Sequence, residues 1–526
     1  VISAFSVFLL FYTATRGTIL GLILGVIVTA FLVAYKGGEK YKRVGLNIIT
    51  GFFILFIIFL GVRNTTYVKT HPVLGRVAEL TISTITNQPR YMVWNMAWQG
   101  FKENPILGWG QDNFNVVFNK YYEPGMYAQE PWFDRAHNVF FDWLIAGGLL
   151  GLLAYLSIFF FAVSEIWNKD STKRFSLIDR SILTGLLVGY FVHNIFVFDN
   201  LLSYVMFFTV IAFIYHEVHS ERDESLKPVP LFKDEFGSWV YISVVIVALG
   251  FSMHYVNVKP IITSRTIIKA LSATNAEEAL GYFKKAISYD TFGTTEAREQ
   301  LIQRAMAFSR NQDQNAMMMK QTFFQTAREE MQKQSEANPL DARYKVFLGA
   351  LYSAYAMHDD ALRTFEEGRM LSPKKQSILF EIVAGNINKG DRSKALEVAK
   401  EVYELEPNYS EARNIYAIAS IYAGDKETAK KLLREAYGTE IIVDDRFIGA
   451  YAASEQFDKV IEIWKKRIEA EPNKHEYRIY LAASYLADNQ RSNAIEELKK
   501  AAELNPTFKE QAEYYIKEIR AGRTPR

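Results

Sequence analysis

Three polar residues stand directly before a long apolar run, and one of them can exchange protons near neutral pH. Arg135, His137 and Asn138 precede residues 139–163, which are long enough to cross a membrane as a helix. A histidine in this setting has one of two uses. It is either an interfacial anchor, where a polar ring marks the boundary of the hydrocarbon, or a reactive group held at the membrane surface.

Further charged residues raise the same choice between chemistry and support. Arg16 lies between two apolar runs, where it either snorkels from a helix end or serves a function, and the second use is commoner. Arg90 follows Pro89 at the start of an amphipathic segment, where a solvated charge would be unremarkable. Asp134 and Arg135 either adjust His137 or are hydrated loop charges.

The remaining histidines predict no metal site. His193 and Asn194 repeat the His-Asn pair near the outer end of another apolar run, and a hydrogen bond between helices is their simplest use, with a supporting role in a site as the alternative. His216 and His219 miss the metalloprotease spacing by one residue, so we expect them at an interfacial helix end.

Composition indicates two unlike halves. Of 526 residues, 49% are hydrophobic, yet an ordinary 22% are charged, so the average conceals a membrane part and a soluble part. A net charge of +2 gives no reason to expect nucleic acid as a partner. Because cysteine is absent from the sequence, a disulfide framework, a thiolate nucleophile and a cysteine zinc site are excluded.

Seven apolar runs are candidates for membrane spans. They cover residues 1–12, 17–35, 46–62, 139–163, 181–198, 201–217 and 239–257. The short basic loops 36–43 and 168–174 should stay cytoplasmic, which places Arg16, the segment 63–138 and everything after residue 258 on the outer face. The chain begins at Val1 within an apolar run, so we expect earlier spans to precede it.

Beyond residue 260, proline recurs at a fixed interval. Pro339, Pro373 and Pro407 are 34 residues apart, as are Pro472 and Pro506, and the gap between the sets fits one shortened repeat. This period is typical of tetratricopeptide repeats. Six or seven repeats would form an α-solenoid. The small and large residues that such repeats pack together are present in three copies. They are Leu348, Gly349, Tyr352, Ala361 and Phe365 in one repeat, Tyr485, Ala494 and Ala501 in another, and Ala279, Phe283 and Ala286 in a weaker first copy. The methionine run 316–319 is expected to fill core space.

The outer segment is rich in aromatic rings. Tyr91, Trp94, Trp98 and Phe101 recur at helical spacing and predict an aromatic helix face that lies flat at the interface. The other rings of the segment (Trp109, Phe114, Tyr121, Tyr122 and Trp132) either anchor it in lipid or stack on sugars, and anchoring is the commoner use. The Gly-Trp-Gly turn at 108–110 is not a nucleotide fingerprint, because no strand precedes it.

Three blocks together resemble the O-antigen ligase and polymerase superfamily. They are "TATRGTILGL" (13–22), "RYMVWNMAWQGFKENPILGWGQDNF" (90–114) and "AHNVFFDWLIAGGLLGLLAYL" (136–156), in the order and membrane setting of that family. The likeness covers residues 1–217. It implies a membrane glycosyltransferase that takes a glycan from a polyprenyl-pyrophosphate carrier on the outer face, without a metal or other cofactor.

The resemblance also implies roles for three residues. Arg16, Arg90 and His137 fall on the family's functional positions. Guanidinium groups can hold phosphate oxygens bidentately while negative charge develops on the departing pyrophosphate. His137 can take the proton of an acceptor hydroxyl. Arg135 and His193 are possible supporting residues.

The sequence therefore predicts an all-α protein, a polytopic transmembrane helix bundle followed by a tetratricopeptide-repeat solenoid. The expected parts are a ligase-like membrane domain (1–217), a cytoplasmic linker (218–237), a last membrane helix (238–258) and an extracytoplasmic solenoid (259–526). We expect a multi-pass protein of the cytoplasmic membrane that acts on a carrier-linked glycan and a lipid or protein acceptor, contacts membrane lipids, and binds protein segments in the solenoid groove. A polymerase that extends the carrier-linked chain and a non-enzymatic scaffold for envelope assembly are the alternatives.

Overall fold

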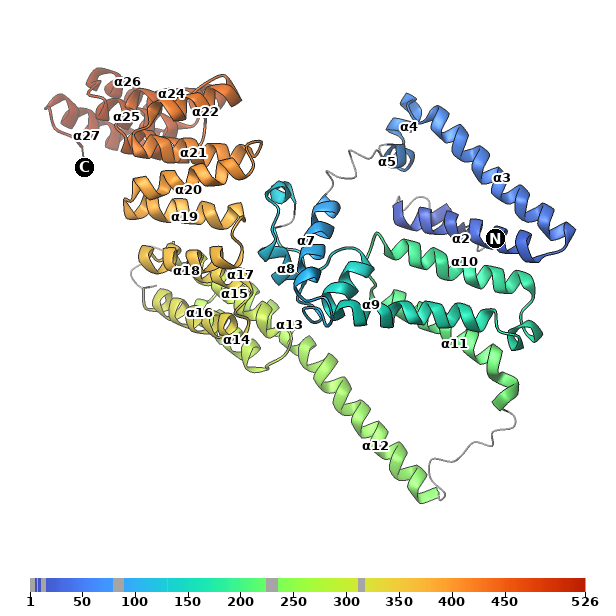
Figure 1. The fold of residues 1–526 in the computed structure, drawn as a ribbon. Coiled ribbons are helices and arrows are strands. Elements are labelled where there is room, and N and C mark those ends of the chain that lie inside the picture. Colours follow the sequence, from blue (N-terminus) through green and yellow to red (C-terminus); the bar gives the residue numbers. More distant parts are fainter. Residues whose placement is uncertain are drawn as a thin grey trace. The chain divides into compact units, whose positions relative to one another are not determined.

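The computed structural model describes residues 5–6, 8–10, 16–78, 89–129, 131–223, 235–310 and 317–525, all helical or irregular without a strand. The all-α prediction is confirmed. The chain divides into two compact units, one of residues 1–268 with 286–294 and one of residues 269–285 with 295–526 (Figure 1). Most of the predicted linker, residues 224–234, lies outside the described residues.

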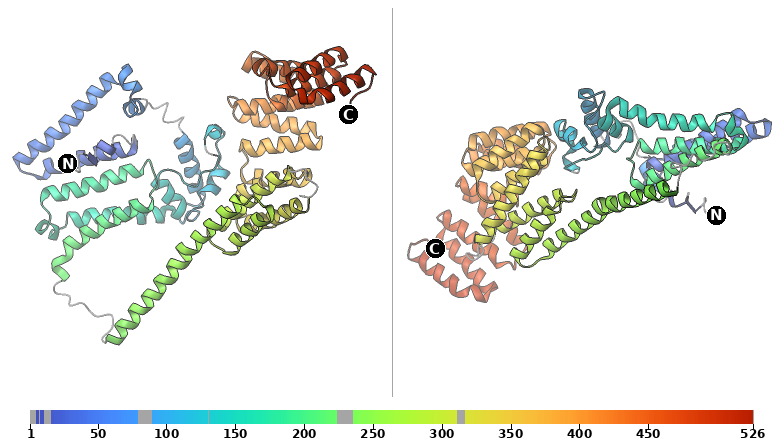
Figure 2. Two further views of the ribbon diagram at one scale, coloured as in Figure 1. Left: turned by 180° about the vertical axis from the view of Figure 1, so that it is seen from behind. Right: turned by 90° about the horizontal axis from the view of Figure 1, so that it is seen from below.

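The first unit contains the apolar helices. They are α2 (Arg16–Lys36), α3 (Glu39–Val62), α9 (Val139–Ile166), α10 (Leu177–Asn194), α11 (Leu201–Asp223) and α12 (Glu235–Met253), which runs on through a π-helical turn (His254–Val258) into α13 (Lys259–Ser272). Helices α2, α10, α9 and α11 lie side by side in the views of Figures 1 and 2.

Five of the seven predicted spans are found in the described part of the chain. Five stretches are long and apolar enough to cross a membrane, namely Gly17–Lys36, Glu39–Val62, Val139–Ile166, Leu201–His219 and Phe236–Ser272. The run 1–12 lies mostly outside the described residues. The run 181–198 corresponds to α10, which carries Asp179 and Arg180 near its start and is therefore more polar than the other five.

Helix α10 packs against α2 through glycines spaced four residues apart. Gly21 and Gly25 of α2 face Gly185 and Gly189 of α10, and a Cβ atom on Gly21 would lie 2.5 Å from the carbonyl oxygen of Gly189. Small residues at this spacing let two membrane helices approach backbone to backbone. This close contact fixes the start of α2 beside the end of α10.

Cation–π contacts show that the two basic loops lie at one end of the first unit. The Lys36 ammonium lies 4.5 Å from the centre of the Trp167 ring, and the Arg180 guanidinium lies 5.0 Å from it on the start of α10. His219 Nε2 is 3.3 Å from Glu165 Oε2, so this histidine lies at a helix end, as expected. The loops 36–43 and 168–174 therefore share one side, as the charge pattern predicts, and the starts of α2 and α9 point to the other.

Helix α9 matches the predicted apolar run 139–163 and is broken at Gly148. Gly148 has a φ of 61°, and the segment 105–110 fills the break. The amides of Trp109 and Gly110 donate to the carbonyls of Ile145 (2.6 Å) and Ala146 (3.1 Å), and the amide of Leu149 donates to Pro105 (2.8 Å). The inserted segment thus satisfies backbone groups that an apolar environment would penalise.

The outer segment folds into a cap with a core of its own. Its helices are α4 (Thr66–Thr70), α5 (Leu74–Ala78), α7 (Pro89–Glu103), α8 (Phe114–Lys120) and the 3-10 turn η1 (Pro124–Ala128). Phe114, Phe118 and Tyr122 are buried in this core, and Trp109 packs against it, so these rings stabilise the cap. Tyr91 and Trp98 do remain about half exposed on α7, at 48% and 47%.

The second unit is a stack of helix pairs, as both views of Figure 2 show. It comprises α14 (Ala276–Ser288), α15 (Thr294–Ser309), α16 (Met317–Ala337), α17 (Ala342–Ala354), α18 (His358–Leu371), α19 (Gln376–Lys389), α20 (Arg392–Leu405), α21 (Ser410–Ala423), α22 (Lys426–Tyr437), α23 (Asp445–Ala453), α24 (Phe457–Ala470), α25 (His475–Ala487), α26 (Arg491–Leu504) and α27 (Lys509–Arg520). Helices α17, α19 and α21 start at the predicted interval, and the nine-residue α23 belongs to the shortened repeat. The tetratricopeptide-repeat prediction is confirmed.

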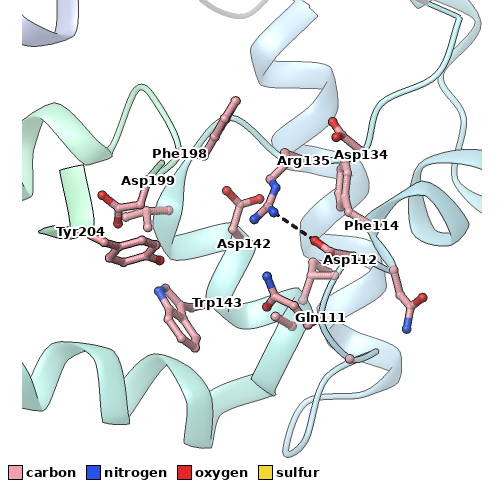
Figure 3. A pocket seen from close by; sticks show the side chains of 15 residues that line it. Gln111, Asp112, Phe114, Asp134, Arg135, Asp142, Trp143, Phe198, Asp199 and Tyr204 are labelled. Carbon is pink, nitrogen blue, oxygen red and sulfur yellow. Dashed lines mark hydrogen bonds and ion pairs between the residues drawn. The ribbon is translucent and has the colours of Figure 1, made fainter. Parts of the chain in front are cut away.

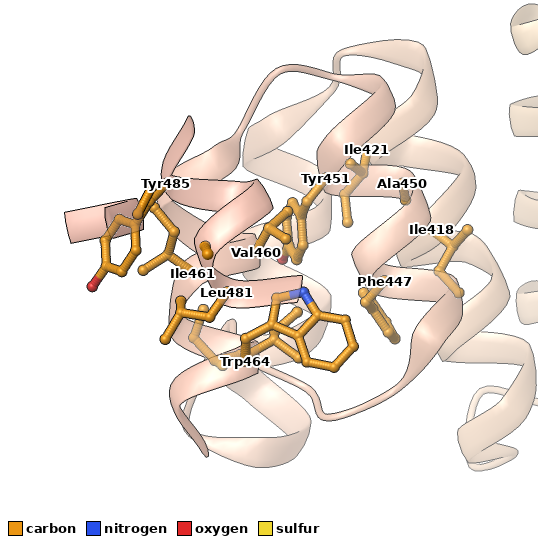
Figure 4. Close-up of a cluster of buried hydrophobic side chains, with 14 of the residues drawn as sticks. Ile418, Ile421, Phe447, Ala450, Tyr451, Val460, Ile461, Trp464, Leu481 and Tyr485 are labelled. Carbon is orange, nitrogen blue, oxygen red and sulfur yellow. The ribbon is translucent and has the colours of Figure 1, made fainter. Parts of the chain in front are cut away.

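Packing in the solenoid follows the predicted pattern, with one exception. Gly349 lets Phe365 lie against the backbone of α17, since a Cβ atom there would meet the ring at 2.5 Å. Trp464 fills the space between neighbouring pairs with Phe447 and Leu481 (Figure 4). The methionine run was expected in the core, but Met317 and Met318 are 68% and 83% exposed at the start of α16, so that prediction is wrong.

Candidate functional site

His137 sits in a tight turn that the following helix holds in place. Its φ is 55°, a left-handed conformation that is uncommon outside glycine. The Asn138 side chain caps α9 by accepting from the amides of Phe140 (2.9 Å) and Phe141 (3.4 Å). One residue before His137, the Ala136 amide donates to Asp142 Oδ1 at 2.8 Å. The start of α9 therefore fixes the backbone on both sides of the imidazole.

The surroundings of the His137 ring assign its tautomer. Nδ1 lies 3.1 Å from the Arg135 carbonyl oxygen, and because a carbonyl can only accept, this contact places the proton on Nδ1. The ring also makes edge contacts with Phe133 and Phe198, at 5.5 and 5.2 Å between ring centres. In the neutral ring Nε2 is then the acceptor, the form that a general base requires.

A partly buried carboxylate at the corner between α10 and α11 lies next to Phe198 in the chain. Asp199 accepts hydrogen bonds from the side chains of Tyr190, Asn194 (3.2 Å) and Ser203 (3.1 Å). Phe198 contacts both His137 and the Arg135 guanidinium, which lies 5.9 Å from the ring centre. The α10–α11 corner thus places the Phe198 ring against the imidazole of His137.

Arg16 begins α2 beside this corner. The structure describes its backbone and not its side chain. Two residues later, Thr18 Oγ1 lies 3.2 Å from His193 Nδ1, which is the hydrogen bond between helices that the sequence suggested as the simplest use of His193. A Cβ atom on Gly17 would lie 2.9 Å from Phe196 Cβ. Arg16 and His137 consequently flank the same α10–α11 corner from two different helices.

Arg90 lies at the end of the cap that carries His137. Helices α7 and α9 run in the same direction, because Trp94 stacks on Phe141 at 6.1 Å and a Cβ atom on Gly100 would lie 3.2 Å from Ile145 Cδ1. Arg90 precedes Trp94 by about one turn, and His137 precedes Phe141 by about one turn. The exposed Arg90 therefore lies at the same end of these two helices as the His137 turn.

A pocket of about 190 Å³ is lined by residues on either side of His137, though not by His137 itself (Figure 3). Its polar lining includes Asp112, Asp134, Arg135, Asp142 and Asp199, and its rings are Phe114, Trp143, Phe198 and Tyr204. Arg135 Nη2 lies 3.0 Å from Asp112 Oδ1. The predicted supporting residue Arg135 is thus part of the pocket wall.

An ion pair outside the pocket joins the two cap helices. Lys120 Nζ lies 2.6 Å from Glu103 Oε1, and its hydrogen bond lowers the pKa of Glu103. The neighbouring Tyr121 has its pKa raised to about 12 by burial and by the nearby Glu103. These shifts belong to the scaffold, since neither group lines the pocket.

Three contributors to the site were missed in the sequence. Asp142 is an acid inside the first turn of an apolar run, and Asp199 with Phe198 lies between two apolar runs. Both carboxylates, like Arg16, are ionisable groups flanked by apolar sequence, and such groups are usually functional.

The described fold is that of a membrane protein with a helical cap and a helical-repeat region. Residues 1–156 match the family described as O-antigen ligase, and this range includes Arg16, Arg90, His137 and Asp142. The α10–α11 corner lies beyond the match. No curated protein matches the chain.

Solved structures with similarity to the chain are repeat proteins. They include the MamA protein (20% identity, TM-score 0.25, 32% of this chain and 94% of that one), a tetratricopeptide repeat protein from Parabacteroides merdae (14%, 0.35, 48% and 97%) and yeast Tom70 (12%, 0.31, 92% and 91%). The repeat assignment rests on the helix intervals and not on these similarities.

Proposed function

We propose that the protein is a glycosyltransferase that moves a glycan from a polyprenyl-pyrophosphate carrier to an acceptor hydroxyl at the outer membrane face. The observation that carries this proposal is the His137 turn, which presents Nε2 as a proton acceptor within the range that matches the O-antigen ligase family. The placement of Arg16 and Arg90 at the same end supports it.

The proposed reaction needs one base and a site for the leaving group. The acceptor oxygen forms a bond to the anomeric carbon while the bond from that carbon to the pyrophosphate oxygen breaks, and the acceptor proton passes to His137 Nε2. Arg16 and Arg90 stabilise the negative charge that gathers on the departing pyrophosphate, as guanidinium groups do for phosphoryl oxygens.

Purified protein incubated with a carrier-linked glycan and a panel of lipid and protein acceptors tests the proposal. The expected result is a glycosylated acceptor together with free polyprenyl pyrophosphate. A glycan that lengthens on the carrier would identify the polymerase alternative. Absence of product with every acceptor, from protein that is folded and inserted, would contradict the proposal and favour the scaffold.

Orientation forms part of the same proposal. Helix α11 ends at the basic loops, so if α12 crosses the membrane, the solenoid follows on the face where the His137 turn lies. There its groove would recruit a protein acceptor or an assembly partner.

The absence of cysteine allows a direct test of the orientation in intact cells. Thr524→Cys should react with a membrane-impermeant maleimide, whereas Thr172→Cys in the second basic loop should react only after the membrane is opened. The reverse pattern would place the solenoid in the cytoplasm and refute the orientation.

A further inference from the structure

We propose that the pocket beside the His137 turn binds an uncharged, hydroxyl-rich sugar unit of one of the two substrates, and not the pyrophosphate. This inference rests on the proposed function and adds the chemistry of the glycan to it. It follows from the charge, the hydrogen-bonding capacity and the rings of the pocket lining.

Charge excludes an anion from this pocket. Four carboxylates line it, those of Asp112, Asp134, Asp142 and Asp199, against the one guanidinium of Arg135. Arg135 is already paired with Asp112 at 3.0 Å. A pyrophosphate or a uronic acid would enter against a surplus of like charge, which costs free energy at these short distances. The pyrophosphate therefore stays outside this pocket, which is consistent with the roles proposed for Arg16 and Arg90.

Asp142 offers an acceptor that the described part of the chain leaves unused. Its Oδ1 holds the Ala136 amide, while its Oδ2 is shielded from solvent and has no hydrogen-bond partner there. Figure 3 shows this carboxylate between Asp199 and Tyr204 on one side and Arg135 and Asp112 on the other. An ionised carboxylate only accepts hydrogen bonds, so its natural complement is a ligand hydroxyl. A sugar hydroxyl that displaces the side chains covering Oδ2 would satisfy this oxygen and connect the ligand to the turn that holds His137.

The rings suit the rest of a sugar. Trp143 and Tyr204 line the pocket on the side of α9 and α11, and Figure 3 shows them next to each other. A pyranose presents C–H groups on one face and hydroxyls around its edge, so it can lie on an aromatic ring while its edge donates to carboxylates. A site of a few polar groups among apolar walls is the usual composition of a small-ligand pocket.

Ligand-detected saturation-transfer NMR on the purified full chain in detergent tests the inference. The probes are neutral hexoses and N-acetylhexosamines, with the matching uronic acids as anionic counterparts. We expect neutral probes to bind and uronic acids to bind at least several-fold more weakly. Asp142→Asn should weaken neutral binding by roughly tenfold, because the asparagine carbonyl can still hold the Ala136 amide while its NH₂ group replaces the acceptor Oδ2. Asp170→Asn, in the second basic loop, is the matched control and should bind as the parent does.

Three results would overturn the inference. They are the absence of saturation transfer to every neutral probe, stronger binding of the uronic acids, and an equal loss of binding in both variants. A protein that binds neutral sugars without transferring a glycan would contradict the proposed function and leave this inference standing. A protein that transfers a glycan without binding any neutral sugar would contradict this inference and leave the proposed function standing.

Competition in the transfer reaction identifies which substrate supplies the sugar. A neutral sugar that binds should raise the KM for the acceptor if the pocket holds the acceptor glycan, or the KM for the donor if it holds the first donor sugar. Either result supports the inference. Binding that changes neither KM would place the sugar outside the reaction path and contradict it.

Discussion

The amide of Ala136 donates a 2.8 Å hydrogen bond to the carboxylate of Asp142, across the turn that presents His137. A residue in the left-handed region is retained only where its surroundings determine the backbone, and this bond is one such determinant. The carboxylate is thus both a wall of the pocket and a support for the imidazole.

The first prediction concerns this bond. Asp142→Ala should loosen the turn by about 1.5–3 kcal/mol, the net value of a hydrogen bond to a charged group. Amide hydrogen exchange of residues 136–138 should speed up accordingly, and glycan transfer should fall by roughly 10²-fold because the base is misplaced. Asp142→Asn should keep the exchange rates close to those of the parent. Equal exchange in all three proteins would show that Asp142 does not hold the turn.

The second prediction concerns the arginines. Arg16→Ala and Arg90→Ala should each lower kcat on the order of 10²–10³-fold, the usual loss on removing one donor to a developing anion. Lysine at either position should restore part of the rate, since it keeps the charge and loses the planar fork. Steady-state kinetics with a varied carrier-linked donor would measure both effects.

Arg63→Ala provides the control for these variants. Arg63 follows α3 and takes no part in the proposed site. If its loss slowed transfer as much as the loss of Arg16 or Arg90, the effect would reflect general positive charge at the membrane surface, and the assigned roles would be wrong.

The third prediction concerns the glycine contact that places Arg16. Gly21→Ala would put a Cβ atom 2.5 Å from the Gly189 carbonyl oxygen, and the helices would have to separate. We expect a loss of about 1–3 kcal/mol in stability, as for other overpacked sites, with a matching loss of transfer. Thermal unfolding in detergent would report the first effect.

Gly51→Ala is the matched change on α3, where an added Cβ atom meets nothing within 4 Å. It should be neutral or stabilising, because alanine favours the helix over glycine. Similar destabilisation by both substitutions would argue that helix propensity, and not the α2–α10 contact, controls the stability.

Periodic features of the fold could be predicted from the sequence, whereas contacts between distant segments could not. The 34-residue interval of proline predicted the starts of α17, α19 and α21, because each repeat buries the same positions. The break in α9 could not be read from its apolar run, since it depends on the segment 105–110 supplying hydrogen bonds from outside the helix.

For the candidate site, too, the sequence predicts local features and not the contacts between distant segments. Hydropathy and charge place His137, Arg16 and Arg90 at membrane boundaries, but no local pattern states how the helices beside them pack. That arrangement follows from the glycines of α2 and α10 and from the parallel course of α7 and α9. The three hydrogen bonds that hold the Asp199 carboxylate at this corner appear only in the fold.

The fourth prediction concerns a buried lysine of the solenoid. Lys375 is 2% exposed, and burial lowers its pKa to about 7 from 10.5. Below pH 7 the lysine is charged in both folded and unfolded chains, so the full cost of burying the charge is present. Between pH 7 and 10.5 only the unfolded chain holds the proton, so stability should rise with pH by roughly 1–4 kcal/mol.

Lys375→Met should remove this pH dependence and stabilise the solenoid at pH 7. Thermal unfolding of the solubilised full chain at pH 7 and pH 10 measures the difference, with the exposed neighbour Lys374→Met as control. A parent and a Lys375→Met variant with the same change between the two pH values would contradict the assignment of the proton to this lysine.

The central claim is that His137 takes the proton of the acceptor hydroxyl, and single-turnover glycan transfer by His137→Ala tests it most directly. The account predicts a fall in the rate of roughly 10²–10⁴-fold, while the protein still inserts and binds the carrier-linked donor. Transfer at the rate of the parent would remove His137 from the mechanism and would contradict the account.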